Sequence, residues 1–170
     1  MNVITSKISG LPQFEEVLNS LESGEGQLNL GLLRAARLPI LAAIQKATNR
    51  PIFLIAHRTN RALSLMEELR LWLPEDRIAF FPEPTTLFYE PGEWGENTRR
   101  ERLFALSQLA QARIPGKKKA DLPILIAPAR AVMARTLPRH EFIRSILTLK
   151  PGKIISMTEI NTRLVNLGYE

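Results

Sequence analysis

The segment from Gly31 to Leu38 (GLLRAARL) has the length of a phosphate-binding loop. In the motif G-x-x-x-x-G-K-[ST], the glycines let backbone N–H groups surround a phosphate, and the hydroxyl group binds magnesium. Only the first glycine is present here: Ala36 stands in the second glycine position, Arg37 in the lysine position and Leu38 in the hydroxyl position. Leucine cannot bind a metal, and alanine resists a positive φ. On the residues alone, the match is a coincidence and does not support nucleotide hydrolysis.

Other catalytic arrangements have less support. Glu90, Glu93 and Glu96 lie close together and could imitate paired carboxylates, but a solvated acidic loop is the simpler interpretation. The chain has no G-x-S-x-G motif, and the serines in its helical patterns have no histidine partner: Ser64, Ser107 and Ser145. Cysteine is absent, and the two histidines, His57 and His140, have no ligand spacing around them. We therefore predict no catalytic residue and no metal site in this chain.

The basic residues are the remaining candidates for a binding role. The net charge of +6 favours an acidic partner, and nucleic acid is the usual one, although a solvated basic surface explains the charge equally well. Arg99 and Arg102 share one face of a predicted helix. The residues that could contact nucleic acid are Arg99, Arg100, Arg102, Lys117, Lys118 and Lys119.

The elements that must position these residues alternate between apolar runs and helical patterns. The runs PIFLIA (51–56) and PILIA (123–127) predict strands buried on both faces of a parallel sheet, and 78–81 and 27–30 predict shorter strands. Helices are predicted over 11–21, 32–47, 60–73, 98–112 and 129–135, and a capping box at Ser156 and Glu159 starts another. This alternation predicts an α/β fold, a parallel sheet flanked by helices.

The long connection within 80–109 (FFPEPTTLFYEPGEWGENTRRERLFALSQL) separates two of these strands. Together with PIFLIAHRTNRALSLMEEL, PILIAPARAVMARTLPRHEF and the terminal LVNLGYE, it resembles the N-terminal UvrB-homology region of bacterial transcription-repair coupling factors (Mfd). The resemblance runs from about Leu28 to the end of the chain. It implies a degenerate P-loop NTPase-like domain, similar to UvrB domain 1a, over 1–144, and the truncated start of a small second domain of the UvrA-binding type over 145–170. Gly31 is then a relic of a phosphate loop.

The resemblance also implies a role for the family. The full protein would be an ATP-dependent DNA translocase that displaces stalled RNA polymerase and recruits nucleotide excision repair through UvrA. ATP and magnesium would bind in motor domains outside this chain, which itself would need no cofactor and would serve as a non-catalytic scaffold. Its truncated second domain should bind UvrA weakly or not at all. UvrB inserts a tyrosine-rich hairpin against DNA, whereas the corresponding segment here has only Tyr89 and Trp94, so that device is not expected.

Two alternatives remain open: an active nucleotide-binding helicase lobe, and a basic DNA-binding module. The sequence contains no apolar run of the ~20 residues that a membrane-spanning helix needs. Its N-terminus also lacks a signal pattern. We therefore expect a cytoplasmic protein with no membrane partner.

Overall fold

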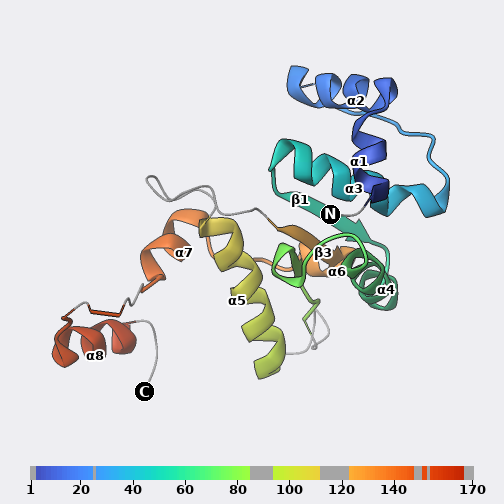
Figure 1. Cartoon of the computed structure of the whole chain (residues 1–170). Helices are drawn as coiled ribbons and strands as arrows, with labels where there is room; N and C mark the ends of the chain where they lie inside the picture. Colours follow the sequence, from blue (N-terminus) through green and yellow to red (C-terminus); the bar gives the residue numbers. More distant parts are fainter. Residues whose placement is uncertain are drawn as a thin grey trace. The chain divides into compact units, whose positions relative to one another are not determined.

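The computed structural model describes residues 3–24, 26–84, 94–111, 123–147, 151–152 and 154–166. Its elements are shown in Figure 1. In chain order they are α1 (Val3–Ser9), α2 (Pro12–Ser23), α3 (Arg34–Thr48), β1 (Ile52–Ala56), α4 (Thr59–Arg70), the 3-10 turn η1 (Glu75–Arg77), β2 (Ile78–Phe80), α5 (Glu96–Gln111), β3 (Ile124–Pro128), α6 (Ala129–Met133), α7 (Arg139–Ser145) and α8 (Met157–Asn166). The chain divides into two compact units, Met1–Ala134 and Arg135–Glu170.

The described part of the first unit is built on a parallel sheet in the order β1-β3-β2. Ile124 of β3 is in register with Ile52 of β1 on one side and with Ile78 of β2 on the other. All five residues of β3 are buried, as expected for the central strand of a sheet that is covered on both faces. The predicted α/β class, a parallel sheet flanked by helices, is confirmed.

The two faces of the sheet carry different helices. On one face, Leu38 of α3 and Leu69 of α4 pack with Ile124 and Ile126. On the other face, Ala105 of α5 and Ala131 of α6 pack with Leu125 and Ala127. The strand order explains this division. From β1 the chain crosses to β2, which leaves room between them for β3, and then it returns in the opposite direction to β3. Because both crossovers are right-handed and run in opposite directions, their helices lie on opposite faces of the sheet.

The predicted strand over 27–30 is wrong, because these residues belong to no strand or helix. The segment QLNL contains no β-branched residue, and it lies between Gly26 and Gly31, so its intrinsic preference for a strand is low. The first strand of the described sheet is instead β1, and the degenerate phosphate loop therefore does not follow a strand.

The prediction that β1 is buried on both faces is also wrong. Phe53 is 44% exposed and Ile55 is 54% exposed, whereas Ala56 is buried. β1 is an edge strand, and α5 and α6 pack over β2 and β3 on the face that Phe53 and Ile55 share. A continuous apolar run does not reveal whether a strand is central or at an edge, so the sequence could not separate β1 from β3.

The second unit contains α7 and α8. As the capping pattern predicts, α8 begins directly after Ser156, and the backbone N–H of Ile160 donates to the Ser156 carbonyl at 3.1 Å. Ile160 and Leu164 are half-buried. The predicted start of a second domain at residue 145 stays a prediction, and Leu167, Gly168 and residues 148–150 lie outside the described part of the chain. Among the described residues, no helix is both long and apolar enough to cross a membrane.

Candidate functional site

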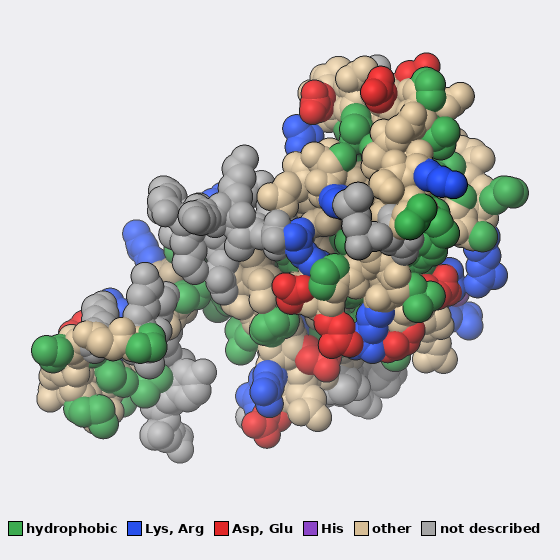
Figure 2. Space-filling model, in the orientation of Figure 1, with side chains coloured by type: hydrophobic (Ala, Val, Ile, Leu, Met, Phe, Trp, Pro, Cys, Tyr) green, Lys and Arg blue, Asp and Glu red, His purple; other side chains and the backbone are tan. Residues whose placement is uncertain are grey.

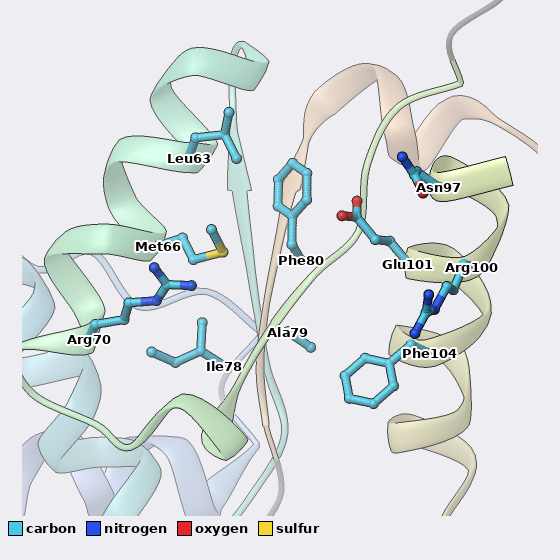
Figure 3. Close-up of a pocket in the computed structure, with 10 residues that line it drawn as sticks. All are labelled: Leu63, Met66, Arg70, Ile78, Ala79, Phe80, Asn97, Arg100, Glu101 and Phe104. Atoms are coloured by element: carbon cyan, nitrogen blue, oxygen red, sulfur yellow. The ribbon is translucent and has the colours of Figure 1, made fainter. Parts of the chain in front are cut away.

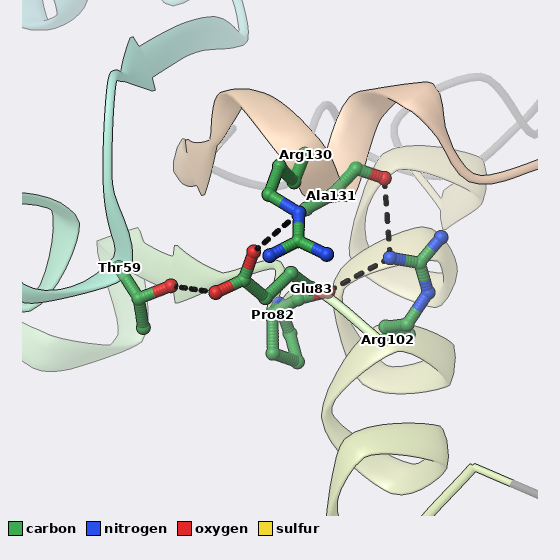
Figure 4. Close-up of polar contacts among 6 residues, drawn as sticks. All are labelled: Thr59, Pro82, Glu83, Arg102, Arg130 and Ala131. Carbon is green, nitrogen blue, oxygen red and sulfur yellow. Dashed lines mark hydrogen bonds and ion pairs between the residues drawn. The ribbon is translucent and has the colours of Figure 1, made fainter. Parts of the chain in front are cut away.

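The carboxyl ends of the three strands meet at one edge of the sheet. Ligands of open α/β sheets bind in the crevice outside this edge, so it is the place to look for a site. Thr59 follows β1, Glu83 follows β2 and Arg130 follows β3, each within three residues of its strand. Figure 4 shows that their side chains converge.

Glu83 is the centre of this cluster. The Thr59 hydroxyl donates to Oε1 of Glu83, and Nε of Arg130 lies 3.7 Å from Oε2. Thr59 is the first residue of α4, so the carboxylate lies at a helix N-terminus, where the helix dipole favours a negative charge. Glu83 is 28% exposed and Arg130 is 49% exposed. Each carboxylate oxygen is thus engaged by a group from a different strand end, and the cluster joins the three strand ends together.

This arrangement suits a structural connection better than acid–base chemistry. A general acid or base must be able to reach the substrate and exchange a proton with it. The Glu83 carboxylate instead accepts from Thr59 and pairs with Arg130. Within the described residues, no group of three or more His, Cys, Asp or Glu side chains could hold a metal ion.

Arg102 forms a second, buried contact at the same edge of the sheet. It is only 3% exposed, and its Nη1 donates to the carbonyl oxygens of Pro82 at 2.8 Å and of Ala131 at 3.2 Å. The guanidinium also lies over two aromatic rings, with Cζ 3.9 Å from the centroid of Phe81 and 4.7 Å from that of Trp94. Burial lowers the pKa of Arg102 below its usual value, because desolvation disfavours the charged form.

The other predicted nucleic-acid residues fall into two groups. Arg99 and Arg100 are exposed on α5, whereas Lys117, Lys118 and Lys119 lie outside the described residues. Arg102 would have to leave its two carbonyl partners to reach a nucleic acid, so its expected role is replaced by the packing role described above. On the face shown in Figure 2, basic and acidic side chains are interspersed over the larger unit. Nucleic-acid contact by Arg99 and Arg100 stays a prediction.

The phosphate-loop residues lie on and before α3. Gly31 precedes the helix with a φ outside the left-handed region, and a Cβ added there would meet nothing within 4 Å. α3 begins at Arg34, so Ala36, Arg37 and Leu38 are helical. Arg37 is exposed and its Nε approaches the Leu32 carbonyl at 3.4 Å. Leu38 is only 6% exposed and packs in the apolar core beneath the sheet. The position that would hold a magnesium-binding hydroxyl is therefore a core position.

The serine and glutamate candidates are placed as follows. Each serine hydroxyl donates to a carbonyl of its own helix: Ser64 to Asn60, Ser107 to Phe104 and Ser145 to Glu141. Glu96 is the first residue of α5, while Glu90, Glu93 and Tyr89 lie outside the described residues. Thr59, Glu83 and Arg130 were not among the predicted site residues. A sequence pattern could have identified them, because each is a polar residue that closely follows a predicted strand.

Known proteins that are similar to this chain indicate which family it resembles. No family model matches the chain. The chain is 27% identical over 171 residues to the transcription-repair-coupling factor of Bacillus subtilis (strain 168), an alignment that covers 100% of this chain. It is 26% identical over 170 residues to the UvrABC system protein B of Fervidobacterium nodosum and 23% identical over 163 residues to that of Mycoplasma mobile, each covering 92% of this chain.

Similarity to both kinds of protein over nearly the whole chain is what a UvrB-homology region predicts. The resemblance to the UvrB-homology region of transcription-repair coupling factors is confirmed. The chain spans only 14% of the Bacillus subtilis protein and 24% of the two UvrB proteins.

The Glu83 cluster has a testable stabilising role in this fold. Replacing Glu83 with alanine is expected to lower the free energy of unfolding by about 1–2 kcal/mol, because a half-exposed hydrogen bond to a charged acceptor and an ion pair are lost. Urea titration followed by circular dichroism measures this change. Glu67→Ala is the matched control, because its ion pair with Arg70 is surface-exposed and should contribute less than about 0.5 kcal/mol. Equal losses for the two variants would contradict the role of Glu83.

Proposed function

We propose that this chain is the N-terminal UvrB-homology region of a transcription-repair coupling factor and acts in it as a non-catalytic scaffold. The similarity to the Bacillus subtilis coupling factor supports this proposal, since it extends over 100% of the chain and only 14% of that protein. In this proposal, the whole protein is an ATP-dependent DNA translocase of DNA repair that displaces stalled RNA polymerase. ATP and magnesium act in motor domains outside this chain.

The observation that carries the scaffold role is the placement of Leu38. A working phosphate loop needs flexible glycines and a hydroxyl at the surface, where phosphate and magnesium can reach them. Here the hydroxyl position is occupied by a leucine that packs with Ala62, Leu69 and Ile124 in the core. This placement argues against the alternative of an active helicase lobe.

The partners in this proposal follow the family. UvrA would be contacted mainly by the second domain, of which residues 145–170 are the beginning. RNA polymerase and duplex DNA would be engaged through the whole protein. A scaffold of this kind needs a stable sheet whose strand ends are held together. The Glu83 cluster and Arg102 hold the strand ends together at the carboxyl edge of the sheet.

Nucleotide titration tests the scaffold role directly. We expect no binding of fluorescently labelled ATP with magnesium up to about 1 mM, a limit that corresponds to a binding free energy near −4 kcal/mol. Fluorescence anisotropy measures the binding, and any P-loop ATPase of known affinity serves as the positive control. Saturable micromolar binding would restore the helicase-lobe alternative.

A further inference from the structure

A groove of about 740 Å³ runs beside β2, on the side of this strand that faces away from β3. Figure 3 shows β2 between two helices that face each other across this groove. Its lining comes from α4, β2 and α5: Leu63, Met66, Arg70, Ile78, Ala79, Phe80, Asn97, Arg100, Glu101 and Phe104. Because α4 and α5 cover opposite faces of the sheet, a space lined by both of them lies at the sheet's edge.

The walls of the groove are apolar and accessible. Leu63 and Met66 are one helical turn apart on α4, and Phe104 lies across from them on α5. Leu63 is 39% exposed and Phe104 is 55% exposed, so each leaves apolar surface in water. An apolar patch between polar side chains at a sheet edge is a usual feature of interaction sites.

Among the described residues, none bonds to the backbone of Phe80 on this side of β2, whereas the N–H of Ile78 donates to the Glu75 carbonyl. The N–H of Phe81 donates to the carbonyl of Ile126 at 2.8 Å, so Phe81 faces β3. Successive residues of a strand direct their N–H and C=O groups to opposite sides, so the N–H and C=O of Phe80 face the groove. An unpaired strand edge is a template for an added strand. The groove therefore combines the backbone N–H and C=O of Phe80 with apolar walls.

One arginine of the groove is available to an acidic partner. The charged residues of the lining are Arg70, Arg100 and Glu101. Arg70 is already paired with Glu67 at 2.6 Å and with Glu75 at 3.3 Å. Arg100 is exposed and forms no ion pair among the residues that the structure describes, so its charge is available to a ligand. A carboxylate beside Arg100 would form a charge-assisted hydrogen bond.

We propose that this groove binds an extended peptide segment of a partner protein, which adds to β2 as a further strand and places an acidic side chain beside Arg100. The backbone groups of Phe80 supply the main-chain hydrogen bonds of strand addition, and side chains on one face of the segment contact Leu63 and Met66. β2 pairs over only three residues, so the segment is short and the affinity is in the micromolar range. This inference is independent of the proposed scaffold function.

Fluorescence anisotropy with labelled eight-residue peptides tests the proposal on the full chain. The probe alternates valine with glutamate, and the comparison peptides alternate valine with lysine or carry N-methylated backbone amides. We expect the glutamate peptide to bind about tenfold more tightly than either comparison peptide. Arg100→Glu should reverse the preference between the two charged peptides. Arg34→Glu, an exposed arginine on α3 outside the groove, is the matched charge control and should leave the preference unchanged.

Two further measurements show whether the peptide binds in this groove. The Phe80 amide should exchange its hydrogen about tenfold more slowly in the presence of the glutamate peptide, because it becomes hydrogen-bonded. Phe104→Ala, which removes an exposed side chain without disturbing the core, should weaken binding severalfold. The proposal is overturned if the N-methylated peptide binds as well as the unmodified one, or if Arg100→Glu leaves the peptide preference unchanged. A dimer that protects Phe80 without peptide would also overturn it, because the occupant would then be a second copy.

Discussion

Replacing Arg102 with alanine is expected to lower the free energy of unfolding by about 3 kcal/mol, the largest single effect at the carboxyl edge of the sheet. The side chain is 3% exposed, and it holds the carbonyls of Pro82 and Ala131. Its removal would leave both carbonyls without this donor in a buried place, and it would remove the cation from the faces of Phe81 and Trp94. Urea unfolding followed by circular dichroism gives the change.

Two substitutions separate the parts of this effect. Arg102→Met keeps an apolar stem of similar length, so its loss of about 2 kcal/mol would report the unpaired carbonyls and the lost cation, without the loss of packing. This control matters because replacing a buried charge with an apolar side chain is sometimes neutral or stabilising. Arg100→Ala changes an exposed arginine of the same helix and should stay within about 0.5 kcal/mol of the parent protein. If Arg102→Met were as stable as the parent, the hydrogen bonds to Pro82 and Ala131 would not be important to the fold.

Restoring the hydroxyl of the phosphate motif is expected to damage the protein. Leu38→Thr should lower the free energy of unfolding by about 3 kcal/mol, because it removes buried apolar volume and introduces a hydroxyl into the core. Leu38 is 6% exposed and packs with Ala56, Leu69 and Ile126. Thermal or urea unfolding measures the loss. Arg37→Lys, at an exposed position of the same helix, is the control and should change stability by less than about 0.5 kcal/mol.

The restored motif is also expected not to bind nucleotide. The triple variant Ala36→Gly, Arg37→Lys, Leu38→Thr regains the second glycine, the lysine and the hydroxyl. In the parent structure, however, these three positions lie inside α3, which begins at Arg34, and no strand leads into the segment. We expect no ATP–magnesium binding up to about 1 mM by anisotropy. Micromolar binding by this variant would show that the lost residues, and not the backbone, are what prevents nucleotide binding.

The groove beside β2 and the carboxyl-edge contacts use different faces of α5. Arg102 points into the fold, where it holds strand ends together, whereas Arg100 and Phe104 line the groove. Arg99, Arg100 and Arg102 stand at i, i+1 and i+3 of this helix, and residue type alone does not tell which of them is buried, so all three were predicted to contact nucleic acid. Burial separates them, and burial depends on what the rest of the chain places beside the helix.

Several features of the fold could be predicted from the sequence because they depend on local sequence. The apolar runs of β1 and β3 and the helical patterns of α4, α5 and α6 specify their own elements. Their alternation predicts a parallel sheet flanked by helices. α1 was missed because its seven residues, VITSKIS, form too short a segment for a periodic pattern. The strand predicted over 27–30 failed for the related reason that four residues cannot show which segment they will pair with.

The fold class, the family resemblance and the loss of the phosphate motif at Ala36, Arg37 and Leu38 follow from the amino-acid sequence. These depend on residue types at fixed spacings along the chain. The folded chain is needed to see that Leu38 is a core residue, that Arg102 is a buried donor, and that Glu83 joins Thr59 to Arg130. The same holds for the groove that brings Phe80 of β2 and Arg100 together. Each of these depends on contacts between segments far apart in sequence, whose positions follow from the packing of the whole sheet.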